Sequence, residues 1–260
     1  MAHSEFTPYD AGSMVWKINR ERLVLLAGPA AAVLQVAHPQ VAMGVAAHSK
    51  FRTDSAGRLS RTLKAVYAVA FGTAAEVEGV RRGVAAAHGA VRGAGYSAFD
   101  PDAQLWVLAT LIMGSVTMYE RFIAKLTPTE LDQFLAEHVR FGEIFGLSPE
   151  MIPTTWPDFL AYWNAMNSGP LLGSHPLCAE VAGAVLQPAA PWYLRCLSPV
   201  FVALTLECLP AAVAGRLKIP ETRLQTPVWR FLDRLLPAVW THLPRRIRFA
   251  PQYLQALKRA

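Results

Sequence analysis

Apolar residues recur along most of the chain at the three- and four-residue spacing of helices, and no convincing period-2 run is present. We expect helices over residues 14–27, 30–37 and 39–48. Gly28-Pro29 and His38-Pro39 should separate them, because the residue before a proline avoids the helical region of the backbone. The periodicity therefore predicts an all-α fold.

Capping residues predict where the later helices begin. Asp100, followed directly by proline, would cap a long helix, and Thr127 with Glu130 three residues later has the capping-box pattern of another. Two more helices are expected, one starting at Thr155 and one over residues 176–186. Frequent prolines in the last quarter of the chain favour short helices there.

The composition is that of a folded protein with a large core. Hydrophobic residues make up 53% of the 260 residues and charged residues 17%, which excludes a disordered chain and a coiled coil. A proline-rich boundary divides the chain into a helical core over residues 1–187 and a helical extension over residues 188–260. We expect the extension to pack on the core.

The net charge of +6 comes from the last part of the chain. Residues 216–260 hold ten Lys or Arg and two Asp or Glu. Such a region can contact anionic lipid or nucleic acid, and it can equally be a solvated face. Trp229, Trp240 and neighbouring leucines favour docking of this region on the body of the protein. We therefore expect no nucleic-acid partner, while peripheral membrane contact through the basic region stays open.

Other global features indicate a cytoplasmic protein. No stretch of about 20 apolar residues is free of charge or proline, so no transmembrane span is expected. The opening residues, MAHSEFTPYD, lack the basic and apolar regions of a signal peptide. Cys178, Cys196 and Cys208 are odd in number and have no metal-binding spacing, which favours reduced cysteines.

Chemistry-bearing residues gather on two expected helices, residues 58–71 and 74–91, joined at Phe71-Gly72-Thr73. Arg58, Arg61 and Thr62 share one face of the first helix, since they lie at i, i+3 and i+4. His88 on the second helix and Arg58 on the first are both roughly 20–23 Å from the joint at 1.5 Å per residue. If the helices run back antiparallel, the four side chains converge, and a histidine there can ligate a cofactor iron.

Each of these residues also has a plainer interpretation. His88 lies on an apolar stripe beside small residues, which suits a flat cofactor, but a core histidine bonded to a backbone carbonyl has the same pattern. The two arginines can be a solvated stripe, and Thr62 can bond back to the carbonyl of Arg58. His48, at the end of its helix, can be a second cofactor-binding residue or a partner for the helix dipole.

At these residues the chain resembles the haem-dependent oxygenases that include latex clearing protein, a rubber oxygenase, and the MpaB-type oxygenases. The resemblance covers roughly residues 20–170 and is carried by four segments: HPQVAMGVAAHSKF, RLSRTLKAVYAVAFGTAAE, VAAAHGAVRG and YSAFDPDAQLWVLATL. It implies a globin-like helical core that holds haem b. The family's proximal iron ligand, a histidine on the second helix, falls on His88.

One position departs from the family pattern. Latex-cleaving members carry R-x-x-K-T on the distal helix, and Arg58 and Thr62 match its first and last residues. Arg61 stands where those members have a lysine that can cap the iron. A guanidinium keeps its proton at working pH and is a poor ligand, so we expect an open or water-capped iron. The departure also weakens the transfer of polyisoprene cleavage to this chain.

The resemblance predicts a haem b-dependent oxygenase that acts on an apolar small molecule. O2 would bind opposite His88, and Arg58, Arg61 and Thr62 would orient and polarise it. Two alternatives remain: a haem-binding sensor or carrier without turnover, and a helical interaction protein with a basic tail.

Overall fold

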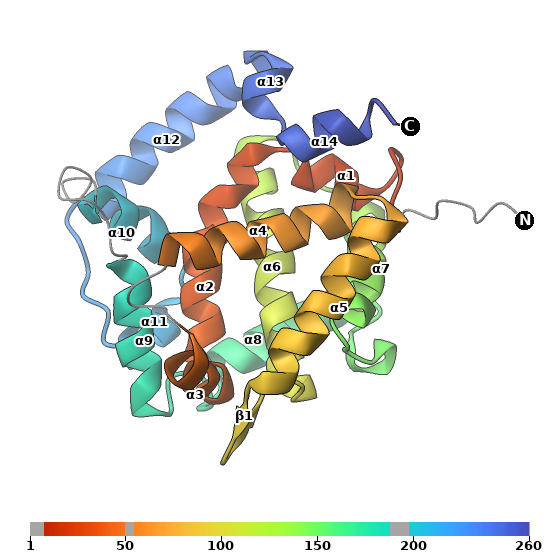
Figure 1. Cartoon of the computed structure of the whole chain (residues 1–260). Helices are drawn as coiled ribbons and strands as arrows, with labels where there is room; N and C mark the ends of the chain where they lie inside the picture. Colours follow the sequence, from red (N-terminus) through yellow and green to blue (C-terminus); the bar gives the residue numbers. More distant parts are fainter. Residues whose placement is uncertain (1–7, 50–54, 188–197, 260) are drawn as a thin grey trace, which may run out of the picture.

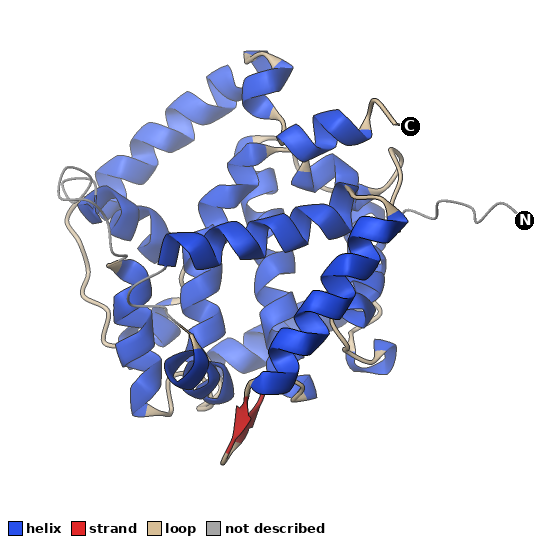
Figure 2. Cartoon of the chain, viewed as in Figure 1, coloured by secondary structure: helices blue, strands red, loops and turns tan. Residues whose placement is uncertain are grey.

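The computed structural model describes residues 8–49, 55–187 and 198–259. Within these residues the regular secondary structure is helical apart from one hairpin whose two strands have two residues each (Figures 1 and 2). The all-α prediction is confirmed. The longer elements are α2 Gly28–Ala37, α3 Pro39–His48, α4 Ser55–Phe71, α5 Ala74–Ala90, α6 Pro101–Phe122, α7 Pro128–Ile144, α8 Trp156–Ser168, α9 Pro176–Leu186, α10 Ser198–Glu207 and α12 Gln225–Val239. The shorter ones are α1 Met14–Asn19, η1 Arg22–Ala27, β1 Arg92–Gly93, β2 Tyr96–Ser97, η2 Pro149–Met151, α11 Ala211–Arg216, η4 Trp240–His242, α13 Arg245–Arg248 and α14 Pro251–Ala256.

The core is built around α2 and α6, which run side by side through the middle of the molecule (Figure 1). Trp106 of α6 is fully buried, and its indole Nε1 donates to the carbonyl of Leu34 on α2 at 2.7 Å. The ring of Trp106 also stacks on Trp163 of α8, with 5.2 Å between the centroids. Helix α9 covers α2 and α3 on the other side. This core supports the α4–α5 hairpin, which crosses its face (Figure 1).

The predicted capping sites lie where the sequence placed them. The side chains of Asp100, Thr127 and Thr155 accept the backbone N–H three residues ahead at the starts of α6, α7 and α8. Helix α7 then ends before Gly146, which has a positive φ of 93°. The break at His38-Pro39 is also confirmed, because His38 has extended backbone between α2 and α3.

The single helix predicted over residues 14–27 is wrong. The chain leaves α1 at Arg20, and Glu21 has extended backbone that forms an isolated antiparallel bridge with Phe249. Gly28-Pro29 does not break a helix either, because Pro29 lies in the first turn of α2, where no intrahelical N–H is needed. A contact with a distant part of the chain therefore overrides the local helical pattern.

The hairpin between α5 and α6 was not predicted. Strands β1 and β2 pair antiparallel with Arg92 opposite Ser97 and Gly93 opposite Tyr96. Gly95, with a φ of 81°, makes the turn, and a Cβ at Gly93 would lie 2.6 Å from the Tyr96 ring. Two residues per strand are too few to produce an alternating pattern.

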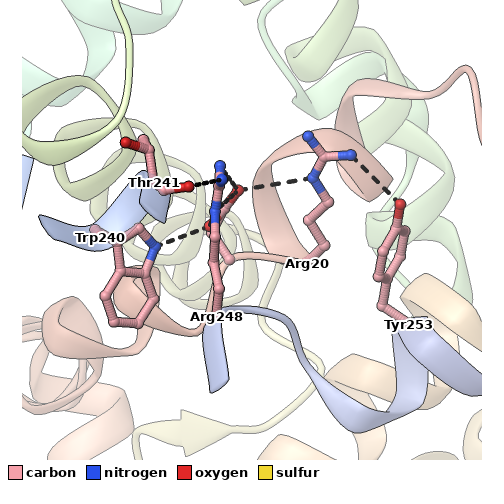
Figure 3. Close-up of polar contacts among 6 residues, drawn as sticks. Arg20, Trp240, Thr241, Arg248 and Tyr253 are labelled. Atoms are coloured by element: carbon pink, nitrogen blue, oxygen red, sulfur yellow. Dashed lines mark hydrogen bonds and ion pairs between the residues drawn. The ribbon is translucent and has the colours of Figure 1, made fainter. Parts of the chain in front are cut away.

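The C-terminal residues dock on the core through a buried carboxylate. Glu21 is fully buried, and Arg248 donates to both of its oxygens from Nη2 at 2.6 Å and from Nε at 2.8 Å. Trp240 Nε1 donates to the same carboxylate at 2.9 Å, and Arg20 lies on its other side (Figure 3). The hydroxyl of Tyr253 accepts a hydrogen bond from Nη1 of Arg20 at 3.3 Å. This hydrogen bond links α14 to the end of α1.

The described residues of the extension share the hydrophobic core of the rest of the chain. The expected boundary near residue 187 adjoins residues 188–197, which lie outside the described part, and the division into residues 1–187 and 188–260 stays a prediction. Cys196 also lies outside it, while Cys178 and Cys208 are free thiols. Helix α12, with 15 residues, is longer than the short helices expected there, and it accommodates Pro237 in its last turn.

Within the described residues, no single helix has the length and apolar character needed to span a membrane. One bent pair, Arg22–Ala37 with Pro39–His48, meets the criterion by length and composition alone, with a bend of 100° between its halves.

Candidate functional site

The candidate site is the hairpin of α4 and α5. Thr73 Oγ1 accepts the backbone N–H of Glu76 at 3.3 Å, and the Glu76 carboxylate accepts the N–H of Thr73 at 2.7 Å, so a complete capping box starts α5. A Cβ on Gly72 would lie 2.3 Å from the carbonyl oxygen of Ala68, and only glycine fits this joint. The two helices diverge from the joint (Figure 1).

The joint is fixed to the body by residues from two segments that are distant in sequence, α1 and the C-terminal residues at and after α14. Trp16 Nε1 donates to the carbonyl of Ala70 at 2.8 Å, and Arg259 Nη2 donates to the carbonyl of Phe71 at 2.7 Å. The Phe71 ring packs edge-on against Tyr253, with 5.6 Å between the centroids. These contacts satisfy carbonyl groups at the end of α4 and hold the hairpin where its helices separate.

After this anchored joint, helix α5 runs along the surface of the molecule with little contact to the core. None of its side chains is buried, although Val77, Val80 and Val84 form a partly buried apolar stripe. The helix meets the body again at its far end, where Val91 lies against Gly44 of α3. An apolar stripe with so little protein cover suits a helix that forms one wall of a binding site.

His88 lies on the last turn of α5, half-buried, with an unusual environment for its ring. Its Nδ1 is buried without a hydrogen-bond partner among the described residues, and its ring meets Phe99 edge-on at 5.9 Å. Burial lowers the pKa of His88 below the ordinary 6.5, so the imidazole is neutral at pH 7. A neutral imidazole offers a nitrogen lone pair, which is what a metal ion requires of histidine.

His138 shows what a purely structural histidine looks like in the same protein. It is buried in α7, and its Nδ1 lies 2.8 Å from the carbonyl oxygen of Phe134. His88 makes no such bond, which separates it from the plain core histidine considered above. The contrast favours a role for His88 that a missing partner would complete.

The other predicted residues occupy three places. Arg61 and Thr62 are exposed on the first half of α4, and Arg58 lies one turn earlier with its side chain outside the described part. No hydrogen bond or ion pair joins Arg61 or Thr62 to His88 among the residues described. His48 is exposed at the end of α3, and its Nε2 lies 3.0 Å from the hydroxyl of Tyr96 on β2. The structure thus connects His48 to the hairpin that follows His88, while α4 diverges from both (Figure 1).

Two buried polar groups near these elements were not singled out by the sequence. The hydroxyl of Tyr67 on α4 is buried without a partner, and burial raises the pKa of this phenol to about 12. His38, at the junction of α2 and α3, has a buried Nδ1 without a partner, and burial lowers its pKa. The sequence favoured a turn residue at His38, with a second ligand or a pocket wall as the alternative, and nothing in its sequence context showed that the ring would be covered.

No group of three or more His, Cys, Asp or Glu side chains in the described ranges could hold a metal ion. Charges on α5 are paired locally instead: Arg81 donates to Glu78 at 2.7 and 2.8 Å on the exposed side of the helix. His88 and Val84 share a side of α5 with Val77, Val80 and Val91, and Arg81 lies at the edge of that side.

Comparison with known proteins identifies the family of the chain. Residues 16–239 match the family described as ER-bound oxygenase mpaB/B'/Rubber oxygenase, catalytic domain. Uncharacterized proteins of Mycobacterium bovis and Mycobacterium tuberculosis are each 27% identical to the chain over 225 residues, covering 79% of this chain and 87% of each relative. No solved structure matches the chain. The match spans the α4–α5 hairpin and continues through α12, and the chain therefore belongs to the mpaB/rubber oxygenase catalytic-domain family.

Proposed function

We propose that this oxygenase-family protein uses haem b, with His88 as the iron ligand, to oxygenate an apolar small molecule. One observation carries the proposal: the half-buried His88 has a covered Nδ1 without a hydrogen-bond partner among the described residues, on a helix that is otherwise only partly covered by the protein. Membership of an oxygenase family supplies the reaction class. The cytoplasmic location expected from the sequence remains part of the same proposal.

The residues present fit such a group. The orphaned ring of His88 has the protonation state that an iron ligand needs, and its apolar surroundings suit a porphyrin. Helices in direct contact lie 8–10 Å apart, so a macrocycle requires helices that separate. The divergence of α4 and α5 from an anchored joint supports this, because the hairpin need not unfold to accept the group (Figure 1).

Each part of the hairpin would have its own task. His88 would hold the group from α5, and Val80 and Val84 would exclude water from that face. Arg61 and Thr62 on α4 would supply positive charge and a hydroxyl to the side of the site where O2 reacts. Since Arg61 occupies the position of the family's lysine and keeps its proton, no protein side chain from this position would compete for the iron.

When bound, haem would supply the oxygen chemistry, which no side chain in the chain can perform alone. The protein would contribute the ligand, the dipoles and a dry apolar surface for the substrate. The partly buried valines of α5 favour an apolar substrate, because they offer contact area without hydrogen-bonding groups.

The absorption spectrum of protein produced with sufficient haem tests the cofactor. We expect a Soret band for the wild type, loss or a shift of the band in His88→Ala, and partial recovery when imidazole is added to that variant. His242→Ala is the matched control, because His242 is exposed on η4 and far along the chain from the hairpin. A colourless wild-type protein, or an unchanged band in His88→Ala, would refute the assignment.

Oxygen consumption with a panel of apolar substrates tests turnover. Arg61→Leu should lower turnover while leaving haem content unchanged, because Arg61 is proposed to act on oxygen and not to hold the haem. Haem-loaded protein that consumes no oxygen with any member of the panel would favour a sensor or carrier instead.

A further inference from the structure

We propose that the outer face of α12, together with α13, binds the surface of an anionic lipid bilayer. We define this outer face as Leu224, Phe231, Leu235 and Val239, which recur at intervals of seven and four residues along one side of the helix. The proposal concerns a surface far from His88 in sequence and does not depend on the cofactor.

Exposed apolar side chains are concentrated on this surface. Phe231 is 61% exposed and Ile247 of α13 is 52% exposed. The other three outer-face residues are each more than a third exposed. Five of the nine large exposed hydrophobic residues in the described ranges fall between positions 224 and 247. Single exposed apolar residues are ordinary on soluble proteins, but such a concentration marks an interaction site.

The opposite side of α12 is firmly attached to the core. Trp229 is 2% exposed, its Nε1 donates to the carbonyl of Ala203 at 3.1 Å, and its ring stacks on Phe122. Arg121 of α6 lies over the Trp229 ring and forms a two-bond ion pair with Asp233 at 2.7 and 2.8 Å. Because this side is anchored, α12 cannot turn its outer face inward to hide it.

The charges around the outer face are nearly all positive. Arg223, Arg230 and Arg234 follow one another at helical spacing along its edge, are exposed, and have no ion-pair partner among the described residues. The only acidic residue in α12, Asp233, is already neutralised by Arg121. Arg245 and Arg246 extend the positive edge onto α13, beside Ile247.

This combination matches the chemistry of an anionic bilayer surface. An interfacial helix inserts apolar side chains between lipid headgroups while Lys or Arg along its edge contacts the lipid phosphates. A second copy of the chain would bring the same arginine edges together, and nucleic acid would leave Phe231 and Leu235 without a partner. Figure 1 shows α12 and α13 along one outer edge of the molecule, where a flat surface can reach both.

Co-sedimentation of the full-length protein with lipid vesicles tests the proposal. We expect binding to vesicles of equal parts phosphatidylglycerol and phosphatidylcholine, weaker binding at high salt, and little binding to phosphatidylcholine alone. Phe231→Ser with Leu235→Ser should reduce partitioning by about tenfold or more, because each loses the burial of a large apolar side chain. Arg230→Glu should reduce it by about fivefold for each unit of charge removed.

Two matched controls separate the outer face from general effects. Leu171→Ser removes an apolar residue that is 41% exposed in the loop before α9, and Lys125→Glu reverses a charge that lies after α6. Both should bind vesicles like the wild type. The proposal would be overturned if the wild type did not bind anionic vesicles, or if Phe231→Ser/Leu235→Ser bound them as well as the wild type. It would also be overturned if the same variants abolished self-association and no lipid binding were found.

Discussion

The contact between Glu21 and Arg248 offers the sharpest test of how the C-terminal helices are held. Arg248→Met removes the hydrogen bonds from the guanidinium to both oxygens of Glu21 and leaves a carboxylate with no exposed surface. Trp240 Nε1 would still donate to it at 2.9 Å, and Arg20 would remain at 3.7 Å. One neutral donor and one long ion pair cannot replace a bidentate guanidinium.

The magnitude follows from the burial of the two partners. Breaking a buried ion pair by removing one partner costs about 3–5 kcal/mol, because the other charge stays desolvated. The Arg248 side chain is 17% exposed, so water can reach the gap, and we expect the lower end, about 3 kcal/mol. In a chain of this size that corresponds to a loss of about 6–12 °C in Tm.

A double-mutant cycle separates the ion pair from simple loss of packing. Glu21→Leu with Arg248→Met removes both charges, and its free energy of unfolding should be closer to that of the wild type than that of Arg248→Met alone. Urea unfolding followed by far-ultraviolet circular dichroism measures all four proteins. Arg246→Met is the matched control, because Arg246 is exposed two residues away and lacks an ion-pair partner among the described residues. A cost for Arg248→Met below about 0.5 kcal/mol, or strictly additive single effects, would refute the reasoning.

Three further predictions concern individual residues. Burial lowers the pKa of His138 from 6.5 to about 4. As the pH falls, His138 is therefore protonated in the unfolded chain before it is protonated in the folded protein. The free energy of unfolding should therefore drop by about 3 kcal/mol between pH 6.5 and 4, and urea titrations of His138→Gln should lack that component. An identical pH profile in the variant would contradict this. Gly72→Ala should lower Tm, because the Cβ would meet the Ala68 carbonyl, whereas Gly79→Ala, with open space inside α5, should stabilise by about 0.5–1 kcal/mol. Equal effects at the two glycines would count against the close contact. Thr127→Ala should cost about 1 kcal/mol in urea unfolding, since it removes the acceptor for the Glu130 N–H, and a neutral result would show that the cap contributes nothing.

The chain's helices were predictable wherever a local rule determines the backbone. Thr73 with Glu76 and Thr127 with Glu130 are capping boxes that need only residues within one turn. His38 before Pro39 avoids helical backbone whatever surrounds it. The joint between α4 and α5, and with it the positions of Arg61 and His88 on separate helices, was therefore accessible from the sequence, although α4 begins three residues earlier than predicted.

Other features depend on partners far along the chain. Helix α1 stops at Arg20 because Glu21 bonds to Arg248 and its backbone pairs with Phe249, more than two hundred residues away. The β1–β2 hairpin is too short to leave a pattern. The sequence also could not show that the His88 ring is covered on Nδ1 without a hydrogen-bond partner, since that depends on which atoms the folded chain brings near it.

The sequence by itself determined the helical class, most helix ends and the family-like residues of the α4–α5 hairpin, because helix periodicity and capping are local interactions. Only the tertiary structure decided that α4 and α5 diverge from a joint held by Trp16, Tyr253 and Arg259, and that α12 buries one side and exposes the other. These outcomes depend on burial and on long-range hydrogen bonds. They are set by the positions of distant residues in space, which no short stretch of sequence specifies.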